Sequence, residues 1–148
     1  MMKLKLPIDI LVVDDEEDFV EMLSMRLSDA GHRVRTAFDG DAALAALDEA
    51  ECDVVLLDIR MPGKDGITVL TAIKHDHPLV EVIRLTGHGT VDTAVDGLKS
   101  GAFDYVQKPA KFDELLEKLE DARDHRAEHE KRVRRAEARA LMRHSGDV

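Results

Sequence analysis

The first residues that could do chemistry are two adjacent carboxylates near the start of the chain. In the stretch DILVVDDEED, residues 9–18, an apolar run over 10–13 ends directly at Asp14 and Asp15. Neighbouring carboxylates repel each other, and a nearby positive charge is what favours their ionised form. A pair of acids at the end of a strand-like run therefore predicts a cation at this position.

Three further polar residues stand at the ends of other strand-like runs. Asp58 ends DVVLLD, Thr86 ends LVEVIRLT, and Lys108 follows DYVQ. In an open parallel sheet, ligands bind beyond the carboxyl ends of the strands, where the strand order reverses. For the order 2-1-3-4-5, that point lies between the first and third strands. The sequence thus predicts that three carboxylates converge there, with the threonine and the lysine at neighbouring strand ends.

The predicted cluster of acids also indicates its cation. Three clustered carboxylates cannot all stay ionised without a counter-charge. Hard oxygen ligands at a site open to water suit Mg²⁺, which completes an octahedral shell with waters and phosphate oxygens. We therefore expect Mg²⁺ at this edge of the sheet, with the Lys108 ammonium beside it.

Alternating strand and helix patterns supply the elements that must position these residues. Short β-branched runs favour strands over 8–13, 33–37, 53–58, 79–86 and 104–107. Helical spacing favours helices over 17–31, 40–50, 67–76 and 90–101, and a long final helix from about Lys111. This alternation implies βαβ units. The sequence predicts an α/β fold, a flavodoxin-like doubly wound five-stranded parallel sheet in order 2-1-3-4-5, with an extended C-terminal helix.

Composition and charge exclude several classes of function. The 148 residues carry a net charge of −10, which argues against generic binding to nucleic acid or an anionic membrane. No run of about 18 apolar residues is present to span a membrane. Cys52 is a single cysteine, interpreted as a small half-buried residue, and it permits neither an internal disulfide nor a zinc cluster. These features predict a cytoplasmic protein with one compact domain.

The segment 111–148 differs from the rest in composition. It carries ten basic and ten acidic residues, so the first 110 residues hold the whole net charge. Acidic residues dominate 111–124, and basic residues dominate 131–143. A coiled coil and a solvated or partly frayed helix are both open alternatives here. The coiled coil would use a heptad seam, interrupted in its middle, made of Leu115, Leu119, Ala122, Arg126, His129, Val133, Ala136 and Ala140.

Four stretches, in this order, resemble the response-regulator receiver domain of two-component signalling. They are LVVDDEED, VVLLDIRMPGKDG, VIRLTGHG and GAFDYVQKPA, and the resemblance covers residues 8 to about 122. It implies a receiver domain over 1–122 and a C-terminal helical extension over 123–148. Residues 85–109 are most similar to receivers of sigma-54-dependent activators, yet no Walker motif or helix-turn-helix follows. The polar ending HSGDV favours a stand-alone receiver over a piece of a longer regulator.

In that family, a histidine kinase phosphorylates the acid that closes the third strand, so the resemblance implies this role for Asp58. A carboxylate oxygen attacks a phosphohistidine, and an acyl phosphate forms. Asp14, Asp15 and Asp58 would hold Mg²⁺ together with the backbone carbonyl of Arg60. Such transfer is mainly positioning and charge neutralisation. The domain is therefore not expected to be an enzyme beyond its own phosphorylation and dephosphorylation.

The resemblance also implies a conformational switch. Lys108 would pair with Asp58 and then with a phosphoryl oxygen, and the Thr86 hydroxyl would bind another. Tyr105 takes the place of the family's switch aromatic. The face formed by the fourth helix, the fifth strand and the final helix then changes its partner preference. Expected partners are a sensor histidine kinase or phosphotransfer protein, a downstream protein target, and a second copy bound through this face or through the final helix.

Several charged residues need a separate interpretation. Arg84 interrupts VIRLT, where the family usually has an apolar residue, and a charge in a central strand is costly unless it is paired. We expect Arg84 to reach the final helix or a partner subunit. Glu16, Glu17 and Asp18 are interpreted as solvated first-turn acids that favour the helix dipole.

Two other functions compete with signalling. A Mg²⁺-dependent phosphohydrolase would also form an aspartyl phosphate. Such enzymes typically have Asp-x-Asp at the first strand and carry a capping insertion, whereas this chain has Asp-Asp there and no insertion. A DNA-binding regulator would use the basic residues of 131–143. The acidic net charge and the lack of a recognition-helix pattern argue against nucleic acid as a partner.

Overall fold

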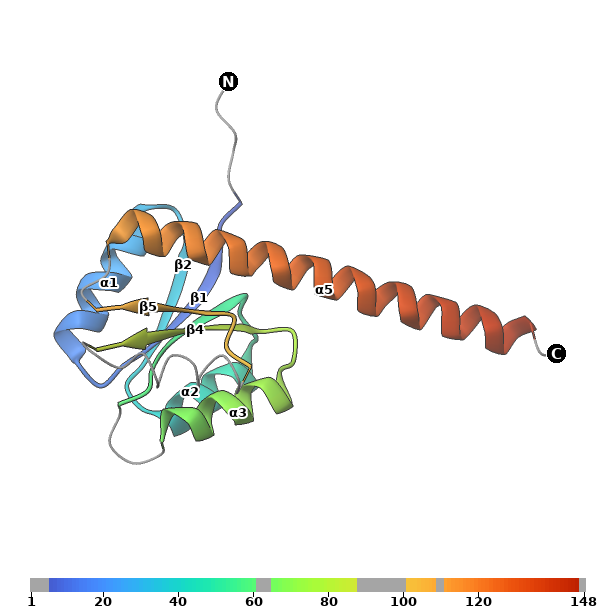
Figure 1. Ribbon diagram of the computed structural model, residues 1–148, viewed down its shortest axis with the longest axis horizontal. Helices are drawn as coiled ribbons and strands as arrows, with labels where there is room; N and C mark the ends of the chain where they lie inside the picture. Colours follow the sequence, from blue (N-terminus) through green and yellow to red (C-terminus); the bar gives the residue numbers. More distant parts are fainter. Residues whose placement is uncertain (1–5, 61–64, 88–100, 109–110, 147–148) are drawn as a thin grey trace, which may run out of the picture.

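Figure 1 shows a computed structural model of the chain, which describes residues 6–60, 65–87, 101–108 and 111–146. The strands are β1 (Asp9–Val13), β2 (Arg33–Ala37), β3 (Val54–Asp58), β4 (Glu81–Thr86) and β5 (Asp104–Gln107). The helices are α1 (Glu17–Asp29), α2 (Gly40–Glu49), α3 (Gly66–Asp76) and α5 (Phe112–Gly146). The helix predicted over 90–101 falls on residues outside these ranges, except for its last one.

The five strands form one parallel sheet in the order β2-β1-β3-β4-β5, which confirms the predicted fold. All five residues of β3 are buried, because helices cover the sheet on both faces. In the register, Val13 near the end of β1 lies opposite Leu57 near the end of β3. The residues that come next in the chain, Asp14 and Asp58, are therefore neighbours.

Helices form a layer on each face of the sheet (Figure 1). α1 and α5 pack on one face, where they bury Leu23, Leu27 and Leu115. α2 and α3 pack on the other face, where they bury Leu47 and Ile73. Each fully buried side chain of this size contributes about 1.5–3 kcal/mol relative to an exposed one. The two cores hold the strand ends rigidly in place.

Short-range hydrogen bonds and one glycine set the ends of several helices. Asp39 accepts a hydrogen bond from the N–H of Ala42 at 2.7 Å, and Asp65 accepts one from Ile67 at 3.3 Å. Such N-caps contribute about 0.5–2 kcal/mol each. After α1, Gly31 has a φ of 96°, a left-handed conformation that suits glycine. The chain therefore leaves α1 close to the predicted stop.

α5 is one continuous helix of 35 residues that extends far beyond the sheet (Figure 1). Its first half buries Leu115, Leu119 and Ala122 in the core of its own domain. The first three positions of the predicted heptad seam are therefore not available to another helix, and a coiled coil is restricted to later positions. Despite the length of α5, no helix among the described residues has an apolar stretch that could cross a membrane.

Arg126 fixes α5 to the amino-terminal edge of the sheet. Its guanidinium nitrogens lie 3.6 Å from Glu51 Oε1 and 3.6 Å from Asp53 Oδ1. Nη1 also donates a hydrogen bond to Glu130 on the same helix at 3.3 Å. The side chain is 18% exposed, so these pairs are partly shielded from solvent. The charge that interrupts the heptad pattern thus serves as an anchor within the chain.

Arg84 is fully buried in β4. Its neighbours Ile83 and Leu85 belong to the core under α1 and α5, and successive side chains of a strand point to opposite faces. Arg84 therefore points to the face that α2 and α3 cover. The expectation that it reaches the final helix is wrong, because α5 packs against the other face of the sheet.

Candidate functional site

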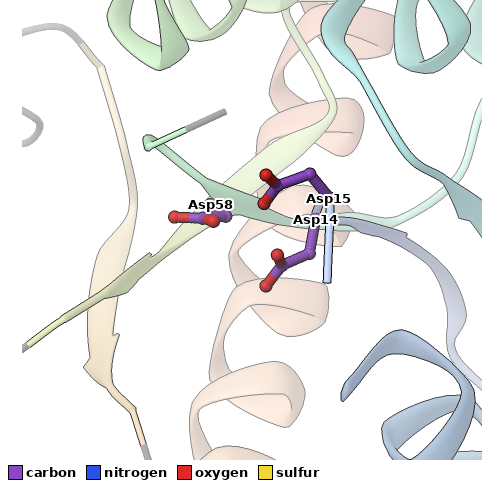
Figure 2. A group of neighbouring side chains, drawn as sticks. All are labelled: Asp14, Asp15 and Asp58. Atoms are coloured by element: carbon purple, nitrogen blue, oxygen red, sulfur yellow. The ribbon is translucent and has the colours of Figure 1, made fainter. Parts of the chain in front are cut away.

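The ends of β1 and β3 bring three carboxylates together. Asp14 and Asp15 follow β1 directly, and Asp58 is the last residue of β3. One oxygen of each carboxylate lies within 4.8 Å of the others. Figure 2 shows the three side chains gathered at this edge of the sheet. The predicted strand order therefore places these acids beside each other.

Lys108 supplies positive charge to this cluster. Asp14 is fully buried, and the Lys108 ammonium donates a hydrogen bond to its Oδ2. The backbone N–H of Glu16 donates to Oδ1 of Asp14 at 3.0 Å. Lys108 Nζ also lies 3.6 Å from Asp58 Oδ2. One ammonium thus stands between two carboxylates that would otherwise repel each other.

Asp58 is 6% exposed, and its Oδ1 accepts a hydrogen bond from the backbone N–H of Arg60 at 3.0 Å. Burial raises the pKa of the Asp58 carboxyl; the Arg60 amide and the Lys108 charge oppose this rise, and Asp14 adds to it. The net effect is a pKa above the ordinary value. Further positive charge near Asp58 would favour its ionised form.

The position of Lys108 is set by the backbone and by an aromatic ring. Its N–H donates to the carbonyl of Thr86 at 2.7 Å, directly after β5. Its Nζ lies 4.5 Å from the ring centroid of Phe19. Burial lowers the pKa of the ammonium, but the hydrogen bond to Asp14 and the neighbouring carboxylates raise the pKa more. The net rise keeps Lys108 charged.

Sequence reasoning misses two residues of this site, Glu16 and Phe19. Glu17 and Asp18 lie in the first turn of α1 as expected, but Glu16 is the N-cap residue, and its carboxylate lies 3.7 Å from Lys108 Nζ. Phe19 follows Glu16 by three residues, which places both on one side of the helix start. That spacing is the signal that would have found them.

Thr86 and Tyr105 lie on the adjacent strands β4 and β5. Thr86 is buried, and its hydroxyl donates a long hydrogen bond of 3.5 Å to the carbonyl of Val106. The Tyr105 side chain is 39% exposed, with Lys118 Nζ 5.2 Å from its ring centroid. The Thr86 hydroxyl is therefore weakly held, and the Tyr105 ring is partly in solvent.

The donor set fits a divalent cation. When all three carboxylates are ionised, the single ammonium of Lys108 leaves two negative charges uncompensated. Carboxylate oxygens are hard ligands, and Mg²⁺ binds through few protein groups while it keeps several waters. Asp15 is exposed, so water reaches the cluster from that side. Among the described residues, the carboxylates of Asp14, Asp15 and Asp58 are close enough together to bind one ion.

A groove of about 540 Å³ opens beside Lys108, between α1 and the start of α5. Apolar side chains supply most of its lining, among them Phe19, Met22, Leu23 and Phe112. The cluster of acids is therefore adjacent to a mostly apolar groove.

Comparison with known proteins assigns the family. Residues 10–120 match the family described as "Response regulator receiver domain". The chain is 42% identical over 110 residues to the nitrogen assimilation regulatory protein NtrX of Azorhizobium caulinodans, covering 73% of this chain and 24% of that protein. It is 44% identical over 121 residues to the transcriptional regulatory protein ZraR of Salmonella typhimurium, covering 82% of this chain and 27% of that protein.

A solved structure agrees with these matches. The receiver domain of NtrX from Brucella abortus has a TM-score of 0.75 at 45% identity, covering 78% of this chain and 98% of that one. The chain thus spans about a quarter of the curated relatives and nearly all of an isolated receiver. The predicted resemblance to a receiver of the sigma-54 activator type is confirmed. The chain belongs to the response regulator receiver domain family.

Proposed function

We propose that Asp58 accepts a phosphoryl group from a phosphohistidine of a sensor histidine kinase or phosphotransfer protein. A carboxylate oxygen of Asp58 forms a bond to phosphorus, the bond from phosphorus to the imidazole nitrogen breaks, and an aspartyl phosphate results. The observation that carries this proposal is the convergence of Asp14, Asp15 and Lys108 on Asp58.

The other groups of the site position the reactants and balance charge. Mg²⁺, held by Asp14, Asp15, Asp58 and the backbone carbonyl of Arg60, would neutralise charge on the phosphoryl oxygens. Lys108 changes partner, from the carboxylates to a phosphoryl oxygen. Its Nζ already lies 3.6 Å from Asp58 Oδ2, so this change needs little movement.

The phosphoryl group then shifts a conformational equilibrium. The Thr86 hydroxyl leaves its 3.5 Å hydrogen bond to Val106 for a phosphoryl oxygen, and the Tyr105 ring turns inward into the space released. The half-exposed ring fits the unphosphorylated state. A bias of about 2–3 kcal/mol makes a minor state the major one. The surface that includes β5 and α5 then prefers a different protein partner; the fourth helix expected to complete this surface lies outside the described residues.

The same proposal includes the reactions that the domain catalyses, its location in the cell and the bounds of its parts. The domain catalyses its own phosphorylation and dephosphorylation and no other reaction, and it works in the cytoplasm. Residues 1–122 form the receiver, and 123–148 form a helical extension that continues α5. That the chain does not bind nucleic acid stays a prediction. One relative is named "DNA-binding transcriptional regulator NtrC", and the match covers 25% of that protein.

The test is phosphorylation with a small phosphodonor and Mg²⁺, read by intact mass. The wild-type chain gains one phosphate, and Asp58→Asn gains none. Asp53→Asn is the matched control, because Asp53 directly precedes β3 at the end opposite Asp58, and its substitution should leave the phosphate in place. Addition of phosphate to Asp58→Asn, or none to the wild type, would overturn the proposal.

A further inference from the structure

The exposed side of α5 carries its charges in two separate stretches. Four acids come first and are here named the acidic stretch: Glu117, Asp121, Asp124 and Glu128. Four arginines follow and are named the arginine stretch: Arg132, Arg135, Arg139 and Arg143. All eight side chains are exposed. The receiver chemistry described above uses none of them.

The two stretches lie on one side of the helix. Successive members are three or four residues apart, and at about 3.6 residues per turn such steps return to the same side. Leu115, Leu119 and Ala122 lie on the opposite side, buried against the sheet. Figure 1 shows the second half of α5 projecting past the sheet. This side of α5 therefore forms a continuous charged face directed away from the domain.

Among the residues that the structure describes, the charges of this face are largely unpaired. In the part of the chain that the structure describes, no guanidinium of the arginine stretch has an ion pair or a hydrogen bond. By contrast, Arg134, on another side of α5, donates to Glu130 at 2.7 Å. The acidic stretch has two exposed contacts, at 3.3 Å and 3.6 Å, with neighbours on its own helix. Most of the charge on this face is thus available to a partner.

The geometry points to a second copy of this chain, bound through this face with the two α5 helices antiparallel. The pairing is centred between the two stretches, so the acidic stretch of each copy meets the arginine stretch of the other. In order, Glu128, Asp124, Asp121 and Glu117 face Arg132, Arg135, Arg139 and Arg143 of the partner subunit. Twofold symmetry makes every one of these pairs occur twice.

Charge complementarity fixes the orientation. Parallel helices would place acids against acids and arginines against arginines, which is repulsive along the whole face. The continuous helix also prevents the arginine stretch from folding back onto its own acidic stretch. In the antiparallel pair, each receiver lies on the outer side of its own helix, because the buried side of α5 is opposite the charged face. The two domains therefore do not collide.

The expected association is weak and depends on salt. Exposed ion pairs contribute about 0–1 kcal/mol each, and salt screens them. At about 1 M salt the Debye length falls to about 3 Å. Sedimentation velocity of the unphosphorylated chain should show a dimer at low ionic strength and a monomer at high ionic strength. This association does not rest on phosphorylation of Asp58.

Charge reversal tests the pairing. One variant carries Arg135→Glu and Arg139→Glu, and the other carries Asp121→Arg and Asp124→Arg. Each variant alone should dimerise at least about tenfold more weakly than the wild type, a change of about 1.4 kcal/mol. An equimolar mixture should form heterodimers, because each altered stretch meets its reversed complement. Circular dichroism checks that helix content is retained.

A single pair of adjacent residues gives the matched control. Arg135→Glu and Arg134→Glu change the same charge on the same helix, but Arg134 lies off the charged face. Only Arg135→Glu should weaken the dimer. The inference would be overturned if both variants weakened the dimer equally. It would also be overturned if the dimer persisted at high salt, or if the wild type were monomeric at every salt concentration.

Cross-linking tests the orientation. In the antiparallel pair, a copy with Asp121→Cys should form a disulfide with a copy that carries Arg139→Cys. In a parallel pair, cysteines at identical positions of the two copies would be linked instead. The native Cys52 does not compete, because it is 3% exposed rather than half-buried as predicted, and burial raises the pKa of its thiol to about 12. Links between identical positions would sink the antiparallel arrangement.

Discussion

Lys108 donates a hydrogen bond to Asp14, joining two strand ends that β3 and β4 separate in the sheet. The same ammonium lies 3.6 Å from Asp58 Oδ2, so one cation serves two buried acids. Because Asp15 adds a third carboxylate to the cluster, its negative charge exceeds the positive charge that Lys108 supplies. This imbalance determines how the protein should respond to magnesium and to changes at Lys108.

Magnesium should stabilise the folded chain, because the three carboxylates are gathered only when it is folded. A ligand at about 100 times its Kd adds about 2.7 kcal/mol to the free energy of unfolding. Asp15→Asn should reduce this gain, since it removes an exposed ligand and leaves the core intact. Thermal unfolding with and without Mg²⁺ measures the effect. Asp18→Asn, another exposed acid nearby, should keep the full gain, and an equal loss in both variants would contradict the site.

Lys108→Met should lower the free energy of unfolding by about 3 kcal/mol near neutral pH, because it leaves buried carboxylates without their counter-charge. Loss of the ammonium raises further the pKa of Asp58, which burial already holds above its ordinary value. The folded state therefore binds protons more tightly, and stability should recover as the pH falls. Urea unfolding at several pH values measures this. Lys118→Met removes a more exposed lysine, 23% exposed, and should cost less than about 1 kcal/mol, with no recovery in acid.

The strand order was predictable because β1 and β3 are unbroken apolar runs, which is typical of central strands in a parallel sheet. The strand order determines which strand ends are neighbours. It therefore also predicts that Asp14, Asp15 and Asp58 lie close together. The hydrogen-bond partners of individual side chains were harder to predict. The resemblance to receiver domains implies that Lys108 pairs with Asp58, but it does not reveal that the hydrogen bond of Lys108 goes to Asp14.

Two other features could not be predicted from local pattern. A strand buried on both faces carries no polar alternation, so nothing in VIRLT indicates which face Arg84 points to. The heptad spacing from Leu115 onward is equally compatible with packing on a sheet or on another helix. The structure assigns its first three positions to the domain core, because α5 begins against β4.

Gly66→Ala should destabilise the fold and disturb the loop that follows Asp58. A Cβ at this position would lie 2.3 Å from the Ile59 Cα, so the backbone on one side must move. Overpacking of this kind costs about 1–3 kcal/mol. Gly87→Ala is the matched control, because the nearest atom to its Cβ, Arg60 Nη1, is 3.8 Å away. Urea unfolding should separate the two variants, and equal stability would show that the loop after Asp58 yields easily.

His77 should make stability depend on pH near neutrality. Its ring nitrogens lie 2.7 Å from Glu51 Oε2 and 3.0 Å from Asp48 Oδ1. Burial lowers the pKa of the imidazole, but the two carboxylates raise it more, so the folded-state pKa is above the ordinary 6.5. The protonated ring therefore stabilises the folded state fully below about pH 6.5, and this contribution is lost as the pH rises through the folded-state pKa.

The size of that loss is measured by urea unfolding between about pH 6 and pH 8. His77→Gln removes the ionisable ring and should flatten the decline in this range. His75→Gln is the matched control, since the His75 side chain is 86% exposed and contacts Asp76 beside it on the helix. The wild-type slope should persist in His75→Gln. If His77→Gln kept the wild-type slope as well, the imidazole between α2 and the end of α3 would not be the group that binds the stabilising proton.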